Sequence, residues 1–268
     1  MSGHARIPHL PALDGLRGLA LLGVLLFHAD GALKGGYLGV DLFFVLSGYL
    51  ITALLVAEHN THGTIDLKAF WIRRARRLFP ALLLLMPAIA VYMRLFALPK
   101  EVGSIRWDGL ATLGYVANWR AIFANKSYWD LFAAPSPLEH TWSLAIEEQF
   151  YLLWPIIVYP LLRRRSSRSV LVVALTLAAA SAAAMLWLFD PSRSSRAYLG
   201  TDTRAAGILL GAAFAVALPP ATTVSARLVR VYDVLGAGAI ALVALAWLKL
   251  EGQNPLLYHG GLWATEVA

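Results

Sequence analysis

Seven apolar runs, each about as long as a membrane-spanning helix, constrain most strongly what this chain can fold into. About 20 apolar residues in a helix cross the hydrocarbon core of a bilayer, and in lipid a single segment can satisfy its backbone hydrogen bonds only as a helix. The runs are Leu16–Leu33, Tyr37–Ala57, Leu78–Leu98, Leu144–Leu162, Val170–Phe189, Tyr198–Leu218 and Val231–Leu250. The sequence therefore predicts an all-α fold, a polytopic transmembrane helix bundle of about seven to eight spans.

The composition supports lipid as the solvent of this chain. Apolar residues make up 59% of the 268 residues and charged residues only 15%, and a soluble fold of this length could not bury so much apolar surface. The net charge of +7 comes from basic residues that cluster between apolar runs. Such clustering is typical of membrane-protein loops, so we expect membrane lipid and no nucleic acid as a partner. The absence of cysteine excludes disulfides, thiolate metal sites and a cysteine nucleophile.

Basic residues also predict the orientation of the chain. The clusters are Arg73–Arg77 after the second run, Arg163–Arg168 after the fourth, and Arg227 with Arg230 before the last. Cytoplasmic loops carry an excess of Lys and Arg. We therefore expect a multi-pass protein of the cell inner (plasma) membrane, with its N-terminus and all three clusters on the cytoplasmic side.

An eighth apolar stretch, Trp107–Ala124, is interrupted by polar residues that include Asn118. If this stretch crossed the membrane completely, the Arg163–Arg168 cluster would lie outside. A re-entrant or interfacial segment keeps all three clusters inside, and irregular backbone is tolerated at membrane depth where it lines a protein cavity. We prefer this arrangement, in which Pro99–Thr141 forms an external, partly inserted lid.

The first run carries two ionisable residues, Arg17 and His28. They lie 11 positions apart, which is about three helical turns, so both project from nearly the same face, about 16 Å apart along the axis. An ionisable group inside a span costs roughly 2.5–3.5 kcal/mol on insertion scales and usually marks function. The alternative is that Arg17 anchors the helix at the membrane surface and His28 lies at the interface. For the pair together we favour a functional role.

The second run and the basic segment after it each allow two interpretations. Asp41 either complements the positive end of a helix or is a partner for His28 or a substrate hydroxyl. Ser47 and Gly48 favour close helix packing over chemistry, and no G-x-S-x-G motif surrounds Ser47. The arginines of FWIRRARRLFP either set topology and contact lipid headgroups or bind the phosphates of a soluble donor. They are Arg73, Arg74, Arg76 and Arg77.

The segment HTWSLAIEEQFYLLWP is the strongest local signal. On a helix, His140, Ser143, Glu147 and Tyr151 share one face. The alternative, that Ser143 caps the helix and the acids complement its dipole, explains one acid better than two adjacent ones. Because Glu147 and Glu148 point about 100° apart, we expect a functional role for at least one of them. This helix begins on the external side, where the two sites, His28 and these acids, could meet.

The sixth run places Asp202 and Arg204 in apolar surroundings. A buried or interfacial ion pair explains them better than direct catalysis, and Gly207 and Gly211 follow at helix-packing spacing. We predict no metal site, because His59 and His62 share a polar loop without further ligands. No phosphate-binding glycine loop or dinucleotide fingerprint is present.

In combination these segments resemble the membrane-bound acyltransferase 3 family, which modifies cell-surface polysaccharides, peptidoglycan and some antibiotics. The resemblance covers nearly the whole chain. Its motifs match Arg-x10-His at Arg17 and His28, GVDLFFVLSGYLI, the arginines of Arg73–Arg77, the WSL-x-x-EEQFYLLWP block of Trp142–Pro155, and Gly-Thr-Asp-x-Arg at Gly200–Arg204. The family usually has about ten spans. We therefore expect residues 1–268 to form a single membrane acyltransferase domain that is incomplete at its C-terminus.

The resemblance implies an O-acetyltransferase-like enzyme that moves an acyl group, acetyl by family analogy, from acyl-CoA inside to a carbohydrate or glycoside acceptor outside. Acyl-CoA is a co-substrate, and no permanently bound cofactor is expected. His28 would be the general base, with Glu147, Glu148 and Asp41 in the catalytic set, and Arg17 and Arg73–Arg77 at the donor. Residues expected to hold the acceptor or support the site are Asp14, Asn118, His140, Trp142, Ser143, Tyr151, Asp202 and Arg204.

Two other classes of function remain open. Polar residues within a bundle also suit a transporter or flippase of a glycan or acylated intermediate, although no inverted repeat is visible. An inactive fragment that serves as a scaffold is the third possibility. Thiol release from acyl-CoA separates an enzyme from a transporter.

Overall fold

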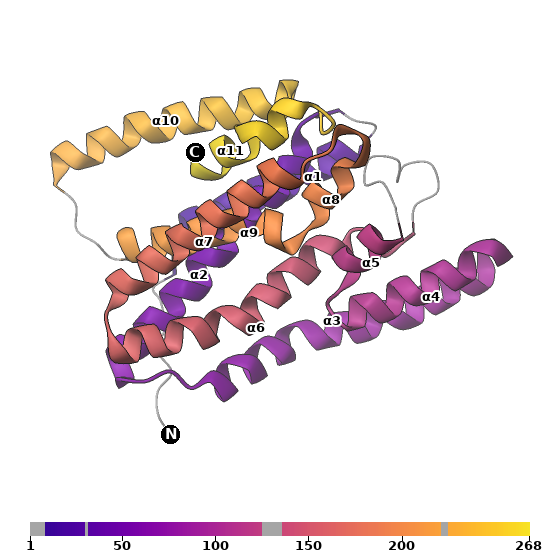
Figure 1. Cartoon of the computed structure of the whole chain (residues 1–268), viewed down its shortest axis with the longest axis horizontal. Helices are drawn as coiled ribbons and strands as arrows, with labels where there is room; N and C mark the ends of the chain where they lie inside the picture. Colours follow the sequence, from indigo (N-terminus) through magenta and orange to yellow (C-terminus); the bar gives the residue numbers. More distant parts are fainter. Residues whose placement is uncertain (1–8, 30–31, 125–135, 221–224) are drawn as a thin grey trace.

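The computed structural model describes residues 9–29, 32–124, 136–220 and 225–268, and in these ranges the chain is helical without strands. The bundle is therefore all-α, as predicted (Figure 1). Its helices are α1 (Pro11–His28), α2 (Gly39–His62), α3 (Leu67–Leu95), α4 (Pro99–Leu113), α5 (Ala117–Phe123), α6 (Thr141–Arg164), α7 (Ser167–Leu188), α8 (Ser194–Leu199), α9 (Thr201–Ala217), α10 (Ala226–Lys249) and α11 (Leu262–Val267). Short turns η1 (Gly36–Leu38), η2 (Pro191–Arg193) and η3 (Leu257–Gly261) lie between them.

Each of the seven apolar runs overlaps one helix of 17 residues or more: α1, α2, α3, α6, α7, α9 or α10. In the described part of the chain, five helical segments are long and apolar enough to cross a membrane: Pro11–His28, Gly36–His62, Leu67–Leu95, Ser167–Leu188 and Leu228–Lys249. α6 differs because its first half carries Glu147, Glu148 and Gln149, and α9 is only 17 residues long. Many leucines on the outer faces of α1, α3 and α10 are exposed, which suits contact with lipid.

The stretch Trp107–Ala124 does not form one continuous helix. α4 ends at Leu113 and α5 begins at Ala117, and the turn between them includes Tyr115, which has a φ of 54°. α4 runs back along α3, and α5 leads towards the beginning of α6 (Figure 1). As a result, the start of α3, the α6–α7 connection and the start of α10 lie at the same end of the bundle. Arg73–Arg77 lie within the first turns of α3, Arg163–Arg168 lie around the α6–α7 connection, and Arg227 and Arg230 lie at the start of α10.

Two interpretations of local structure are wrong. His59 and His62 do not lie in a loop, because α2 continues to His62 and ends at Gly63, whose φ is 70°. Ser143 does not cap α6: the N-cap residue is His140, and no side chain caps the helix. The Ser143 hydroxyl instead donates to the backbone oxygen of His140, at 3.4 Å.

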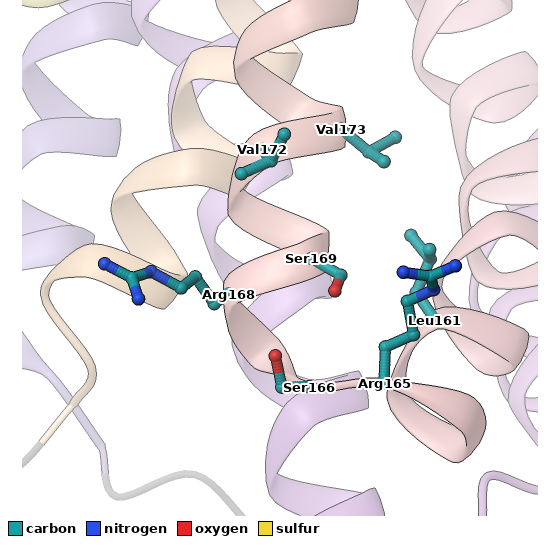
Figure 2. Close-up of a pocket in the computed structure, with 7 residues that line it drawn as sticks. All are labelled: Leu161, Arg165, Ser166, Arg168, Ser169, Val172 and Val173. Atoms are coloured by element: carbon teal, nitrogen blue, oxygen red, sulfur yellow. The ribbon is translucent and has the colours of Figure 1, made fainter.

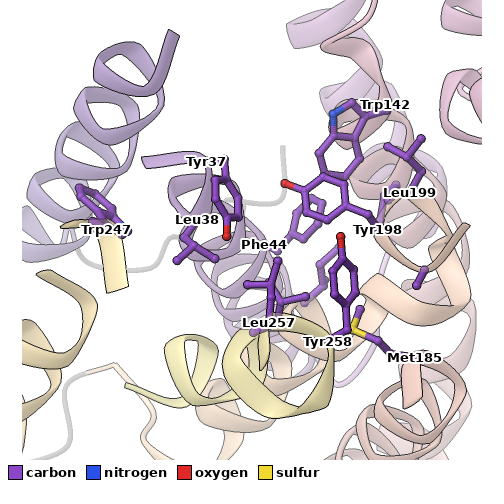
Figure 3. Packing of buried hydrophobic residues seen from close by; sticks show 14 residues of the cluster. Tyr37, Leu38, Phe44, Trp142, Met185, Tyr198, Leu199, Trp247, Leu257 and Tyr258 are labelled. Atoms are coloured by element: carbon purple, nitrogen blue, oxygen red, sulfur yellow. The ribbon is translucent and has the colours of Figure 1, made fainter. Parts of the chain in front are cut away.

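α2 and α9 approach each other closely through glycines. A Cβ on Gly48 would collide with the backbone oxygen of Ile208, and one on Gly211 would collide with the backbone oxygen of Val45. The packing role predicted for Gly48 and Gly211 is therefore confirmed. Beside this contact lies a buried aromatic cluster (Figure 3). It includes Tyr37, Phe44, Trp142, Tyr198 and Tyr258.

Gly48→Val is expected to destabilise the protein strongly, because backbone atoms of α9 cannot move aside as a side chain could. Overpacking of a core typically costs about 1–3 kcal/mol, and a collision with backbone exceeds that range. Gly103→Ala in α4 is the matched control, since nothing lies within 4 Å of its added Cβ. Thermal unfolding in detergent measures both. Equal midpoints for the two variants would contradict the close α2–α9 contact.

Candidate active site

His28 and His140 meet where α1 ends and α6 begins. Their ring centroids are 4.7 Å apart and the rings are nearly perpendicular. His28 Nδ1 lies 2.7 Å from the backbone oxygen of Val24. Because a carbonyl can only accept, Nδ1 carries the hydrogen, and in the neutral ring Nε2 is the basic nitrogen. The structure thus brings together two predicted site residues that sequence spacing alone could not pair.

The pKa of His140 is lowered, mainly by burial and also by the neighbouring charge of His28. A histidine with a lowered pKa binds fewer protons in the folded state than in the unfolded state. Its contribution to stability is therefore complete above the unfolded pKa of about 6.5 and is lost as the pH falls through the lower folded value.

The stability of the folded protein should therefore decrease between neutral and mildly acidic pH. His140→Gln should reduce this dependence, because an amide does not titrate. Thermal unfolding of both proteins across this pH range is the measurement, with exposed His62→Gln as the control. A slope that is the same in wild type and His140→Gln would argue against the assignment.

Arg17 lies at the other end of α1, in the half of the helix away from His28. Its guanidinium is 3.7 Å from Asp14, and Asp14 also contacts His9 at 2.7 Å. Asp14 is therefore a neighbour of Arg17 and does not lie beside His28. The prediction that Arg17 and His28 lie on one helix, about three turns apart, is confirmed, because α1 contains both.

Glu147 is held by residues from two helices. Ser47 Oγ of α2 donates to Glu147 Oε1 at 3.1 Å, and the Tyr151 hydroxyl donates to Oε2 at 3.5 Å. The guanidinium of Arg74 lies 3.7 Å from the centre of the Tyr151 ring, within cation–π range. Ser47 was predicted to serve packing, so its hydrogen bond to Glu147 is a contact that sequence reasoning missed.

Glu148 points in a different direction from Glu147. Its Oε1 is buried, and no described residue donates a hydrogen bond to it. Arg74 and Arg77 are the cations that act on its charge, and Nε of Arg74 is likewise buried without a hydrogen-bond partner in the described part of the chain. The two adjacent acids therefore have different surroundings: Glu147 is hydrogen-bonded, and Glu148 faces the arginines of α3.

The arginines of α3 divide into three environments. Arg73 pairs with Glu58 near the end of α2, at 3.4 Å. Arg74 reaches inward to Tyr151, whereas Arg76 and Arg77 are exposed. Arg76 and Arg77 are therefore surface residues, whereas Arg73 and Arg74 have specific partners inside the bundle.

A closed hydrogen-bond network joins α5, α6 and α9 beside the acids. Asn118 is fully buried and donates to Thr201 Oγ1 at 2.9 Å and to the backbone oxygen of Leu199 at 3.0 Å. Gln149 donates to Asn118 Oδ1 at 3.0 Å and accepts from Thr201 Oγ1 at 2.6 Å. Asn118 was predicted from sequence; Gln149, in the same EEQF segment as the acids, was not.

Asp202 and Arg204 do not pair with each other. Asp202 pairs with Arg196 through two hydrogen bonds of 3.0 and 2.6 Å near the surface. Arg204 is buried, and its Nη2 lies 2.6 Å from Asp41 Oδ1 of α2. The prediction of a buried ion pair is correct for Arg204, but its partner is Asp41. Asp41 is thus neither a simple helix-end charge nor a partner of His28.

The predicted histidines and glutamates are spread along the first half of α6. The His28–His140 contact is at its beginning, and Glu147 is seven residues further on, about 10 Å along the axis at 1.5 Å per residue. Tyr151 and Arg74 lie one turn beyond. The histidines and acids therefore do not meet in one cluster but form a row from the arginines of α3 to His28.

A groove of 370 Å³ lies at the opposite end of α6, where α6 turns into α7 (Figure 2). It is lined by Leu161, Arg165, Ser166, Arg168, Ser169, Val172 and Val173. α6 spans 24 residues, or about 36 Å, so this groove is remote from His28. No group of three or more His, Cys, Asp or Glu suited to a metal ion is found in the described ranges.

The fold and these residues define a class of protein: a multi-pass α-helical membrane protein with ionisable residues in its interior. The family model described as "Acyltransferase domain" matches residues 10–263, and the chain belongs to this acyltransferase family. It is 40% identical over 260 residues to the peptidoglycan O-acetyltransferase OatA of Listeria monocytogenes, covering 95% of this chain and 42% of the relative. It is 38% identical over 265 residues to the O-acetyltransferase OatA of Staphylococcus aureus, covering 97% and 44%. No solved structure matches the chain.

The chain spans less than half the length of these relatives.

Proposed function

We propose that this chain is the membrane part of an O-acetyltransferase that transfers an acyl group, acetyl in the first instance, from acyl-CoA to a hydroxyl of a cell-surface carbohydrate such as peptidoglycan. The observation that carries the proposal is the orientation of His28. Its Nδ1 is committed to the Val24 carbonyl, so the ring presents Nε2 as a base. Family membership supplies the class of reaction. The protein would lie in the plasma membrane with its N-terminus in the cytoplasm.

The row of charges along α6 suits a long, anionic donor. Arg74 and Arg77 face Glu148 from α3, and guanidinium groups match phosphate oxygens in geometry. Acyl-CoA would bind as a co-substrate with its phosphates at these arginines and at Arg17, at the basic end of the bundle. Its pantetheine arm would extend along the helices towards His28. No permanently bound cofactor is needed.

The reaction proposed is a direct transfer with His28 as general base. Nε2 takes the proton of the acceptor hydroxyl as its oxygen attacks the thioester carbonyl carbon. The tetrahedral intermediate collapses, the carbon–sulfur bond breaks, and the imidazolium returns the proton to the leaving CoA thiolate. The acceptor gains the acyl group, CoA leaves as a free thiol, and His28 ends neutral.

The neighbouring residues would support this step. His140 packs edge-on against His28 and restricts its ring, while Ser47 and Tyr151 fix Glu147. Glu148, without a hydrogen-bond donor among the described residues, is the acid available to a substrate group. The Asn118 network secures α5 beside them.

Thiol release from acetyl-CoA by the purified chain in nanodiscs tests the proposal, with a soluble peptidoglycan fragment as acceptor and mass spectrometry of the product. We expect thiol release that requires the acceptor, together with a singly acetylated glycan. Glycan movement across the bilayer without thiol release would instead establish the transporter alternative.

A full-length relative, measured in parallel in the same assay, shows whether the assay detects acyl transfer. If the relative acetylates its acceptor in the assay and folded chain does not, this portion is not sufficient for transfer and the proposal for it fails.

A further inference from the structure

Three buried ionisable side chains from three helices meet beside the aromatic cluster. Asp41 of α2, Arg204 of α9 and Glu266 of α11 are exposed by 1%, 1% and 5%. Arg204 Nη2 lies 2.6 Å from Asp41 Oδ1, and the carboxyl of Glu266 lies within hydrogen-bond reach of Asp41. Gly207 of α9 makes room for Glu266, because a Cβ there would lie 2.8 Å from Glu266 Oε1. No pattern in the sequence indicated that Glu266 joins the other two.

Aromatic rings surround this triad, and the ion pairs and electrostatic contacts of the described residues bring no second cation to it. The guanidinium of Arg204 lies 4.9 Å from the ring centre of Tyr198, 5.5 Å from Phe44 and 5.9 Å from Trp142. Figure 3 shows these three rings close together within the cluster, with Trp142 in contact with both Phe44 and Tyr198. Arg204 is the cation that acts on both acids, and the Tyr198 phenol is a further titratable group that acts on Arg204.

Two ionised acids and one arginine would leave a net negative charge in this interior. An uncompensated buried ion costs several kcal/mol, and two carboxyl groups that share a buried site do not both ionise. Hydrogen bonding leads to the same conclusion. Asp41 Oδ2 and Glu266 Oε2 are buried with no hydrogen donor among the described side chains, and ionised carboxylates can only accept.

We propose that Glu266 is protonated in the folded protein and donates its hydrogen to Asp41, so that Arg204 and Asp41 form a neutral ion pair held by a neutral acid. The charge stays on Asp41 because Asp41 touches the guanidinium directly. Burial, and then the charge of Asp41, raises the pKa of Glu266 well above its ordinary value, in agreement with the charge count.

Glu266 is by this argument a positioning residue. It fixes Asp41, Asp41 fixes Arg204, and Arg204 packs against Trp142, which lies two residues from His140 in the chain. This inference concerns the protonation state of the fold and does not depend on which reaction the protein catalyses.

Infrared spectroscopy of the chain in nanodiscs at about pH 8, where an ordinary Glu is ionised, tests the proposal directly. We expect a carbonyl stretch of a protonated carboxyl group that shifts when the protein is labelled with ¹³C-glutamate. The component from Glu266 should disappear in Glu266→Gln and remain in Glu251→Gln, the control, which removes an exposed acid paired with Lys34.

A second comparison does not rely on a single variant folding. Glu266→Gln keeps a hydrogen donor for Asp41 and should unfold within a few degrees of wild type, whereas Glu266→Leu removes the donor and should unfold at a clearly lower temperature. Absence of the ¹³C-sensitive band from folded wild type, or its full retention in Glu266→Gln, would overturn the proposal.

Discussion

Replacement of His28 by glutamine is expected to lower the rate of acyl transfer by about 10²–10⁴-fold, the usual contribution of a general base. Glutamine keeps a polar group that can reach the Val24 carbonyl but cannot take a proton from an acceptor hydroxyl. The loss should appear in kcat and leave the KM for acyl-CoA nearly unchanged, because the arginines proposed to bind the donor remain in place.

Thiol release with acceptor present, measured over a range of acetyl-CoA concentrations, gives both constants. His62→Gln, at the end of α2, is the matched control and should behave as wild type. Transfer at the wild-type rate by folded His28→Gln would exclude His28 as the base. An increase in KM alone would instead assign His28 to substrate binding.

Arg204→Leu is expected to lower the free energy of unfolding by about 3–5 kcal/mol, the range for removing one partner of a buried ion pair. The variant leaves Asp41 and Glu266 buried without a cation, so that at least one more acid must be protonated for the chain to fold. Part of the cost is also lost packing against Tyr198, Phe44 and Trp142.

Arg196→Leu provides the comparison for Arg204→Leu. Arg196 pairs with Asp202 in good geometry, but both side chains are partly exposed, and exposed pairs contribute about 1 kcal/mol or less. Unfolding of both variants in detergent, followed by tryptophan fluorescence, measures the difference. Similar losses for the two arginines would show that burial does not set the cost of the Arg204 pair.

Much of the bundle could be predicted from local patterns, because the requirement for helices in lipid acts on each apolar run separately. The unusual residues of the interior, such as Asp41 and Arg204, were also visible as charges in apolar surroundings. Their pairing was not, since it depends on α2 and α9 lying side by side. Spacing within a run reveals which face a residue is on and not which helix covers that face.

The missed contacts have the same physical origin. Ser47 offered no local signal for chemistry, and its role emerges only when α6 places Glu147 opposite it. Gln149 was detectable in principle, because a polar amide within an apolar helix needs partners. Glu266 lies in the short helix α11, outside all seven apolar runs. Hydrophobic periodicity therefore could not identify it as a buried residue.

The glycine contact between α2 and α9 has a mechanical consequence. The backbones of α2 and α9 are in contact at Gly48 and Gly211. Because they cannot slide past each other without collision, the two helices are expected to move as one rigid unit. α3, in contrast, buries only Phe70, Leu82 and Ile89 over 29 residues. Under the proposed function, we therefore expect a passage for acyl-CoA to open by outward displacement of α3, which carries Arg74. The α2–α9 pair, which holds Asp41 and Arg204, is expected to stay in place.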